Sequence, residues 1–107
     1  KTYKNYINHE DVRLVYPSEE SNYEITPWLC TIIVNKNRYD LMKKLRDNKV
    51  ETAQVHYRND RYTVFGNRQK DLPNMDLIED KYLVLPLHHK MDLKDCFFIS
   101  NLINEGW

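Results

Sequence analysis

The spacing of hydrophobic residues changes several times along the chain, between the two-residue spacing of a strand and the three-to-four-residue spacing of a helix. Apolar runs rich in β-branched residues predict strands, whereas an apolar stripe opposite charged residues predicts a helix. The pattern predicts, in chain order, a helix end over residues 3–7, strands over 12–16 and 28–35, a helix over 38–48, a strand over 50–56, a short helix from 73 or 74 to 79, a strand over 81–88 and a helix over 93–104.

These elements predict an α+β fold. Strands that alternate with helices form a two-layer sandwich when the helices all cover one face of a small sheet. The polar stretch 18–27 ends in proline and is predicted to be a surface loop. The pattern alone leaves open whether the strands run parallel or antiparallel.

Length and charge narrow the class of protein. A chain of 107 residues is one domain at most. Sixteen basic residues balance sixteen acidic ones, which argues against a nucleic-acid-binding protein with a strongly basic face. No apolar run approaches the roughly 20 residues of a membrane span. Cys30 and Cys96 stand far apart, as expected of reduced cysteines in a cytoplasmic protein, and the start at Lys1 indicates a fragment.

Several common sites are excluded by the residues present. With only Gly66 and Gly106, the chain cannot build a glycine-rich phosphate loop. His88 and His89 are adjacent on a predicted strand, so their side chains diverge and do not share one metal ion. We therefore expect no metal site.

One stretch, "VETAQVHYRNDRYTVFG" (50–66), carries the candidate chemistry, because a strand there feeds a loop rich in polar side chains. His56 can donate or accept a proton near neutral pH. Arg58 and Arg61, with Arg68 and Lys70 further on, can hold a diphosphate or a carboxylate. From the residues alone, a binding loop and a solvated connection are equally good interpretations. Three aromatic side chains can stack on a ring or anchor the loop: Tyr57, Tyr62 and Phe65.

Four segments in order carry a family resemblance: "WLCTIIV", "LRDNKVETAQVHY", "LPNMDLIEDKYLVLPLH" and "MDLKDCFFISNLI". Together they resemble the C-terminal domain of the DegT/DnrJ/StrS family. Members of this family are pyridoxal-phosphate-dependent aminotransferases that act on nucleotide-linked keto-sugars. The order and spacing of the four segments, more than any one of them, support the resemblance.

The resemblance implies that residues 26–107 form the small α+β domain, with a mostly antiparallel sheet. Residues 1–25 then correspond to the last large-domain helix and the crossover segment. The large domain would supply the Schiff-base lysine, the aspartate facing the pyridinium nitrogen and most of the phosphate cup. Pyridoxal phosphate is therefore expected in the full-length homodimer and not on this chain, which has no Ser-x-x-Lys motif and is expected to be inactive alone.

The resemblance also assigns substrate-binding roles, with no catalytic, cofactor-binding or metal residue in this chain. His56 and Tyr57 would approach the sugar or the cofactor, and Arg58 or Arg61 would approach the nucleotide diphosphate. These residues would position the substrate by shape and charge. Many members continue with prolines and an "LHLQ"-like run where this chain has "RNDRYTVFG".

A second interpretation is a stand-alone domain that binds a nucleotide sugar without chemistry. The reading frame upstream of Lys1 distinguishes the two, since a large domain carrying the lysine would identify the enzyme. Aromatic residues near the N-terminus are candidates for a face that packs on that domain, and equally for anchors of a thin core: Tyr3, Tyr6, Tyr16 and Tyr23.

Overall fold

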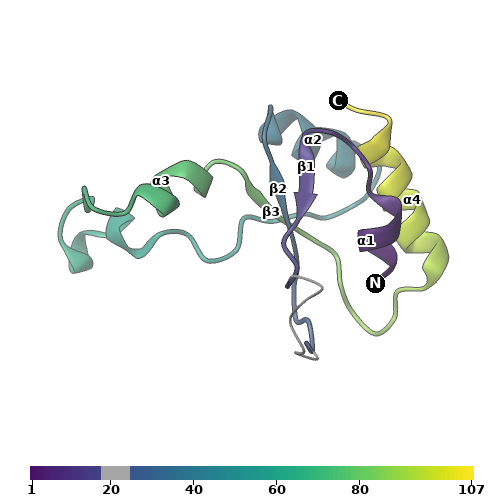
Figure 1. Ribbon diagram of the computed structural model, residues 1–107, viewed down its shortest axis with the longest axis horizontal. Coiled ribbons are helices and arrows are strands. Elements are labelled where there is room, and N and C mark those ends of the chain that lie inside the picture. Colours follow the sequence, from purple (N-terminus) through teal and green to yellow (C-terminus); the bar gives the residue numbers. More distant parts are fainter. Residues whose placement is uncertain (18–24) are drawn as a thin grey trace.

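The computed structural model describes residues 1–17 and 25–107, which form a sheet packed against helices and a long arm that projects away from them (Figure 1). Within these ranges the elements are, in chain order, α1 (Thr2–Tyr6), β1 (Val12–Leu14), β2 (Cys30–Val34), α2 (Arg38–Asp47), the 3-10 turns η1 (Asn59–Arg61) and η2 (Thr63–Phe65), α3 (Pro73–Ile78), β3 (Tyr82–Leu85) and α4 (Leu93–Asn104).

The three strands form one antiparallel sheet in the order β1-β2-β3. Val12 lies opposite Val34 at one side of β2, and Cys30 lies opposite Leu85 at the other. Strand β2 lies in the centre of the sheet, because it pairs with β1 along one edge and with β3 along the other. This confirms the predicted α+β fold with a small, mostly antiparallel sheet.

The core lies between one face of the sheet and three helices. Alternate residues of a strand point to the same face, so Ile32 and Val34 face the helices together with Leu83 and Leu85. Helices α1, α2 and α4 cover this face with side chains that belong to the same buried cluster: Tyr3, Leu41, Leu45, Ile99, Leu102 and Ile103. The helices therefore cover one face, as predicted.

The segment predicted as a strand over residues 50–56 is not a strand in the structure. It makes one isolated bridge, in which Ala53 and Val84 exchange backbone hydrogen bonds of 3.3 and 2.9 Å. His56 then adopts a left-handed backbone with φ of 61°, which ends the extended run. The strand prediction was therefore wrong. The apolar residue Val50, which suggested a strand, is buried in the core beneath the helices and does not pair with a neighbouring strand.

Other strands are shorter than their apolar patterns. The run 28–35 begins to pair only at Cys30, and Trp28 is 74 % exposed. The run 81–88 stops at Leu85, since Pro86 has no N–H to donate to a ladder. Apolar character thus extends beyond the paired residues at both strands.

Helix α4 is fixed at both of its ends. At its start, Asp92 and Asp95 each accept a backbone hydrogen bond of 3.0 Å from the other, which forms a capping box. At its end, the ammonium group of Lys44 in α2 donates to the carbonyl oxygens of Leu102 and Gly106 at 2.7 and 2.8 Å. The helix predicted over residues 93–104 is confirmed.

The N-terminal tyrosines have partners within the chain. Tyr3 is buried, and its hydroxyl donates to the carbonyl oxygen of Pro86 at 3.0 Å. The ring of Tyr6 meets Phe97 edge-on with centroids 4.3 Å apart, and the ammonium of Lys4 lies 4.9 Å from the ring centroid of Tyr16. Tyr3 is therefore an anchor of the core rather than part of an exposed face. Tyr23 lies outside the described residues.

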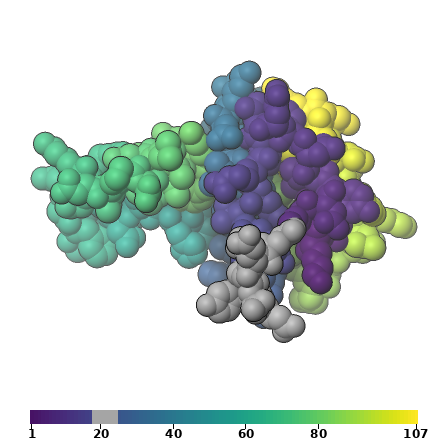
Figure 2. Space-filling model, in the orientation of Figure 1, coloured from purple at the N-terminus to yellow at the C-terminus, as the bar shows by residue number. Residues whose placement is uncertain are grey.

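We call residues 54–81 the arm; it contains η1, η2 and α3. Figure 2 shows it standing clear of the sheet and the remaining helices. None of its residues belongs to the hydrophobic core cluster of the described chain. The arm must therefore be held together by something other than an apolar core.

Candidate functional site

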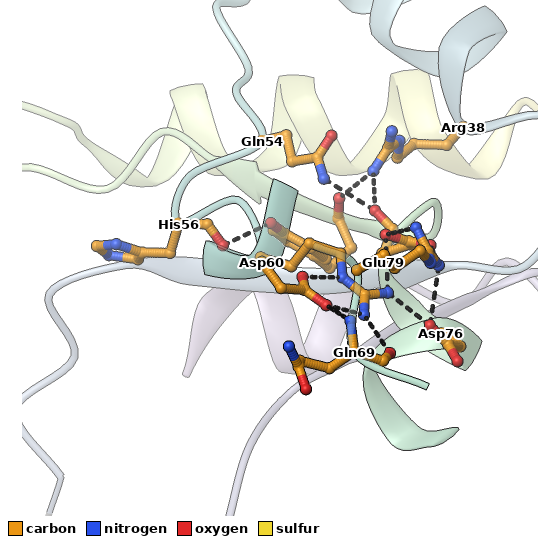
Figure 3. A network of polar contacts seen from close by, with 10 residues as sticks. Arg38, Gln54, His56, Asp60, Gln69, Asp76 and Glu79 are labelled. Atoms are coloured by element: carbon orange, nitrogen blue, oxygen red, sulfur yellow. Dashed lines mark hydrogen bonds and ion pairs between the residues drawn. The ribbon is translucent and has the colours of Figure 1, made fainter. Parts of the chain in front are cut away.

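The predicted substrate-binding residues lie along the first part of the arm. His56 stands at the base of the arm, and its carbonyl oxygen accepts a hydrogen bond of 2.8 Å from the hydroxyl of Tyr82. Its exposed ring lies edge-on to Trp28, with centroids 5.8 Å apart, and points away from the neighbouring polar network (Figure 3). The left-handed backbone at this residue turns the chain outward and presents the imidazole to solvent.

Two side chains hold the base of the arm, where its two ends meet the sheet. Arg38, at the start of α2, donates to the carbonyl oxygens of Glu79 and Tyr82 at 3.1 and 3.0 Å. Gln54 donates to the same Glu79 oxygen at 2.8 Å (Figure 3). Both ends of the arm are therefore tied at one point beside β3.

Arg58 lies at the centre of the arm, and its side chain is only 4 % exposed. It forms a bidentate pair with Asp60 at 2.5 and 2.6 Å. Its Nη1 donates to Asp76 at 2.5 Å and to Glu79 at 3.3 Å, and its Nη2 also reaches the carbonyl oxygen of Gln69 at 3.5 Å. These five contacts match the five N–H groups of a guanidinium, so none is left for a ligand.

The carboxylates around Arg58 stay ionised at neutral pH. Hydrogen bonds from Arg58, and then from a backbone N–H, lower the pKa of Asp60 to about 2. Arg58 likewise lowers the pKa of Asp76, and Arg68, which pairs with Asp76 and Glu79, lowers the pKa of Glu79. The same contacts raise the pKa of Arg58 above its usual value. Two guanidinium groups thus face three carboxylates.

Arg61 and Tyr57 are arranged differently from Arg58. The guanidinium carbon of Arg61 lies 4.3 Å from the ring centroid of Tyr57 and 5.7 Å from that of Tyr62. All three residues are exposed, and among the described residues no carboxylate forms a salt bridge with Arg61. A guanidinium held on an aromatic face keeps its N–H edges available, so Arg61 can bind an anion.

A shallow hollow of about 380 Å³ lies beside these side chains. Gln54, Tyr57 and Arg61 line it together with the charged side chains of the Arg58 network, and its lining contains no lysine. The arrangement suits recognition of a polar, anionic molecule. It does not suit covalent attachment of pyridoxal phosphate, which requires a lysine amine.

Of the residues that complete the network, the sequence indicated Arg68 as a cation but did not identify the three carboxylates. Asp76 and Glu79 are three residues apart, a spacing that places two side chains on one helix face. That spacing is the one available signal, and it does not say which arginine the carboxylates meet. Their pairing with Arg58 depends on how the arm folds back.

An apolar groove elsewhere on the described chain is less suited to polar recognition. A larger groove of about 670 Å³ between β3, α4 and residues 48–53 has a mainly apolar lining, which includes Leu29, Val50 and Phe98. The described residues contain no cluster of metal-binding side chains. Within the same ranges, no helix is long and apolar enough to cross a bilayer. We therefore place the candidate site on the arm.

Comparison with known proteins identifies the family. A sequence model of the DegT/DnrJ/EryC1/StrS aminotransferase family matches residues 1–103. Because this match spans nearly the whole chain, the protein belongs to that family, as the four sequence segments indicated. A search of curated proteins finds no significant match.

Three solved structures, two of them described as aminotransferases, have a similar fold. The sugar aminotransferase CalS13 from Micromonospora echinospora aligns with a TM-score of 0.82 and 22 % identity, over 92 % of this chain and 26 % of that protein. The aminotransferase TlmJ from Streptoalloteichus hindustanus gives 0.85 and 17 %, over 97 % and 28 %. AtS13 from Actinomadura melliaura gives 0.82 and 20 %, over 92 % and 26 %. The chain therefore spans little more than a quarter of each structure.

Proposed function

We propose that this chain is the C-terminal small domain of a pyridoxal-phosphate-dependent aminotransferase that acts on a nucleotide-linked keto-sugar. The family match over residues 1–103 is the observation that carries the proposal. The chain covers only 26 to 28 % of three solved structures with this fold, which supports its being part of a larger enzyme. In this assignment residues 1–25 correspond to the last large-domain helix and the crossover, and residues 26–107 to the small domain; cytoplasmic localisation remains a prediction.

In this proposal the remaining part of the enzyme supplies the chemistry. It would hold the cofactor and its lysine, and the full-length protein would act as a homodimer. The cofactor, when bound there, would supply the electron sink that aminotransfer requires. The arm would add side chains that bind and orient the substrate.

The role of each arginine in the arm depends on whether its N–H groups are free to bind substrate. Arg61 contacts the nucleotide diphosphate, since its guanidinium is exposed and rests on Tyr57. Tyr57, on which Arg61 rests, and His56, the residue before it, contact the sugar or the cofactor. Arg58, whose N–H groups are taken by carboxylates, keeps the loop that carries these residues in place.

The test uses the full-length enzyme from the same gene, with Arg61→Met and His56→Ala as variants. Losing the hydrogen bond of Arg61 to a charged phosphate should raise the KM for the nucleotide sugar by about tenfold or more, with kcat little changed. Losing the contact of His56 should raise the KM in the same direction. Arg13→Met on β1 is the matched control, because Arg13 is also exposed but lies outside the arm. Unchanged KM values in both arm variants would remove these residues from the site.

The alternative is a stand-alone domain that binds a nucleotide sugar without chemistry. The observation in its favour is that the anion-recognising side chains and the hollow beside them are formed within this chain. Calorimetry with the 107-residue chain distinguishes the two functions. Tight binding by a chain whose gene encodes no lysine-bearing domain would favour the alternative.

A further inference from the structure

Trp28 is a large aromatic side chain that the fold leaves open to solvent. At 74 % exposure it is the most exposed aromatic residue in the part of the chain that the structure describes, and it lies outside the core cluster. A single exposed aromatic side chain needs no explanation. Trp28 is not single, because the exposed imidazole of His56 lies edge-on to it with centroids 5.8 Å apart.

The backbone holds both rings of this pair in place. Two residues after Trp28 the chain enters β2 at Cys30, which is buried in the core. The backbone of His56 is left-handed, and its carbonyl oxygen accepts the hydrogen bond of 2.8 Å from the hydroxyl of Tyr82 in β3. Tyr82 is itself largely buried. A hydrogen bond from the sheet thus fixes the turn that brings the imidazole beside the indole.

An indole beside an imidazole suits recognition of a sugar ring. The face of an aromatic ring carries partial negative charge and attracts the C–H groups on one face of a pyranose. The imidazole can donate a hydrogen bond to a sugar hydroxyl or accept one from it. Because an edge-on ring covers at most one face of the indole, the other face stays available for stacking. Aromatic side chains with a few polar groups beside them are typical of small-molecule sites.

The place of this pair on the chain indicates which part of a nucleotide sugar it meets. In the proposed function Arg61 contacts the diphosphate, and His56 contacts the sugar or the cofactor. The sugar and the nucleoside are attached at opposite ends of the diphosphate, so a substrate ring beside His56 is the sugar and not the base. The imidazole also points away from the carboxylates around Arg58 (Figure 3).

We propose that Trp28 is a stacking surface for the hexose ring of the nucleotide sugar, and that His56 contacts a hydroxyl group of the same ring. This inference rests on the proposed function and deepens it, since it assigns the sugar a second contact residue outside the arm. Recognition is then divided: Trp28 and His56 bind the sugar, and Arg61 on Tyr57 binds the diphosphate.

Calorimetry on the full-length enzyme from the same gene tests the stacking without turnover. The probes are dTDP-glucose and GDP-mannose, each compared with its free nucleoside diphosphate. Trp28→Ala should weaken binding of the nucleotide sugar about tenfold, the effect of losing one stacked ring, and change binding of the free diphosphate by less than about twofold. Equal weakening of both would overturn the proposal, because the base would then be the stacked ring. Failure of the unchanged enzyme to bind either nucleotide sugar would also overturn it.

Trp28→Tyr and Tyr39→Ala are the matched variants. Trp28→Tyr keeps an aromatic face and should keep binding of the nucleotide sugar within about threefold of the unchanged enzyme. Tyr39 is 72 % exposed on α2, so Tyr39→Ala removes an equally exposed aromatic side chain and should leave binding unchanged. As great a loss in either variant as in Trp28→Ala would contradict the stacking.

Thermal unfolding of the full-length Trp28→Ala variant distinguishes a binding role from a packing role. Its midpoint should equal that of the unchanged enzyme, because an exposed indole that binds substrate does not support the fold. A lower midpoint would contradict the proposal, since Trp28 would then be packed against protein.

Aminotransferase activity of the unchanged full-length enzyme on nucleotide-linked keto-sugars is measured separately. If Trp28→Ala selectively weakens binding of the nucleotide sugar but the unchanged enzyme is inactive, the sugar contact is supported and the proposed function is contradicted. If the unchanged enzyme is active but Trp28→Ala binds the nucleotide sugar equally well, the function is supported and the sugar contact is contradicted.

Discussion

Arg58 shows how one side chain can hold together an irregular segment that has no apolar core. Its planar guanidinium offers five donors in fixed directions, and carboxylates from η1, α3 and the residue after α3 converge on it. A lysine in its place has one charged nitrogen and cannot form the bidentate pair with Asp60. The arm therefore depends on this residue type at this position.

Replacing Arg58 by methionine should loosen the arm while the sheet and its helices stay folded. The change leaves three carboxylates close together without their shared cation, which destabilises their arrangement. We expect backbone amides of residues 58–78 to exchange about tenfold faster or more, with core amides unchanged.

Arg61→Met is the control for this experiment, because Arg61 is a neighbouring exposed arginine that contacts aromatic rings and not the carboxylates. It should leave exchange in the arm close to that of the unchanged chain. Equal effects of the two substitutions would show that Arg58 is not what holds the arm.

The arm should also loosen in acid. A carboxyl group whose pKa is lowered on folding stabilises the fold above its unfolded pKa and loses that contribution as pH falls through the folded value. For Asp60 this window runs from 3.8 down to about 2. Carboxyl NMR should give an Asp60 midpoint near the lower value, and cleavage of the arm by pepsin should increase within the same window. A midpoint at 3.8 would contradict the pairing with Arg58.

At the scale of elements, side chains form hydrogen bonds with the backbone at both ends of α4. The capping box at Asp92 satisfies backbone donors at its start. Lys44 reaches across from α2 to the last carbonyl groups and to the carboxylate of Glu105 at 3.1 Å. This contact also joins two helices that cover the same face of the sheet.

Lys44→Met should lower the free energy of unfolding by about 1–2 kcal/mol, since a charged donor to carbonyl groups at a helix C-terminus is lost. Lys43→Met is the matched control. Lys43 is exposed and, among the residues that the structure describes, pairs only with Asp47 one turn further along α2, so its loss should cost about 0.5 kcal/mol or less. Denaturant unfolding measures both values, and equal losses would contradict the capping role of Lys44.

Helices were predicted from the sequence more accurately than strands. Helices α2, α3 and α4 occur over nearly the ranges that the apolar pattern predicted, because helical spacing is a local signal. The segment 50–56 looked like a strand because its apolar residues are spaced like one. Strand pairing needs a partner with the right register along its length, and Val84 offers a single bridge.

At the scale of the whole molecule, the chain combines a packed sandwich with a projecting arm. The sandwich has a continuous buried core, whereas the arm is held by ion pairs and by the contacts of Arg38 and Gln54 at its base. This division predicts that recognition and folding stability respond to different substitutions.

The 107-residue chain should not take up pyridoxal phosphate on a lysine. It has no Ser-x-x-Lys motif, and the hollow on the arm contains no lysine in its lining. We expect no stoichiometric absorption band of lysine-bound cofactor that borohydride reduces. A full-length enzyme from the same gene, tested in parallel, should give such a band. A stoichiometric band from the 107-residue chain would contradict this assignment.

By itself, the sequence determined the α+β class, the positions of the main helices and the family, because apolar periodicity, helix caps and ordered motifs are local properties of a chain. It also drew attention to the basic residues after residue 55. Only the tertiary structure decided which of them are free to bind. Arg58 and Arg61 are three positions apart, yet one is enclosed by carboxylates from residues 60, 76 and 79, and the other is exposed on an aromatic ring. The difference arises because the arm folds α3 back onto Arg58, a contact that no spacing rule encodes.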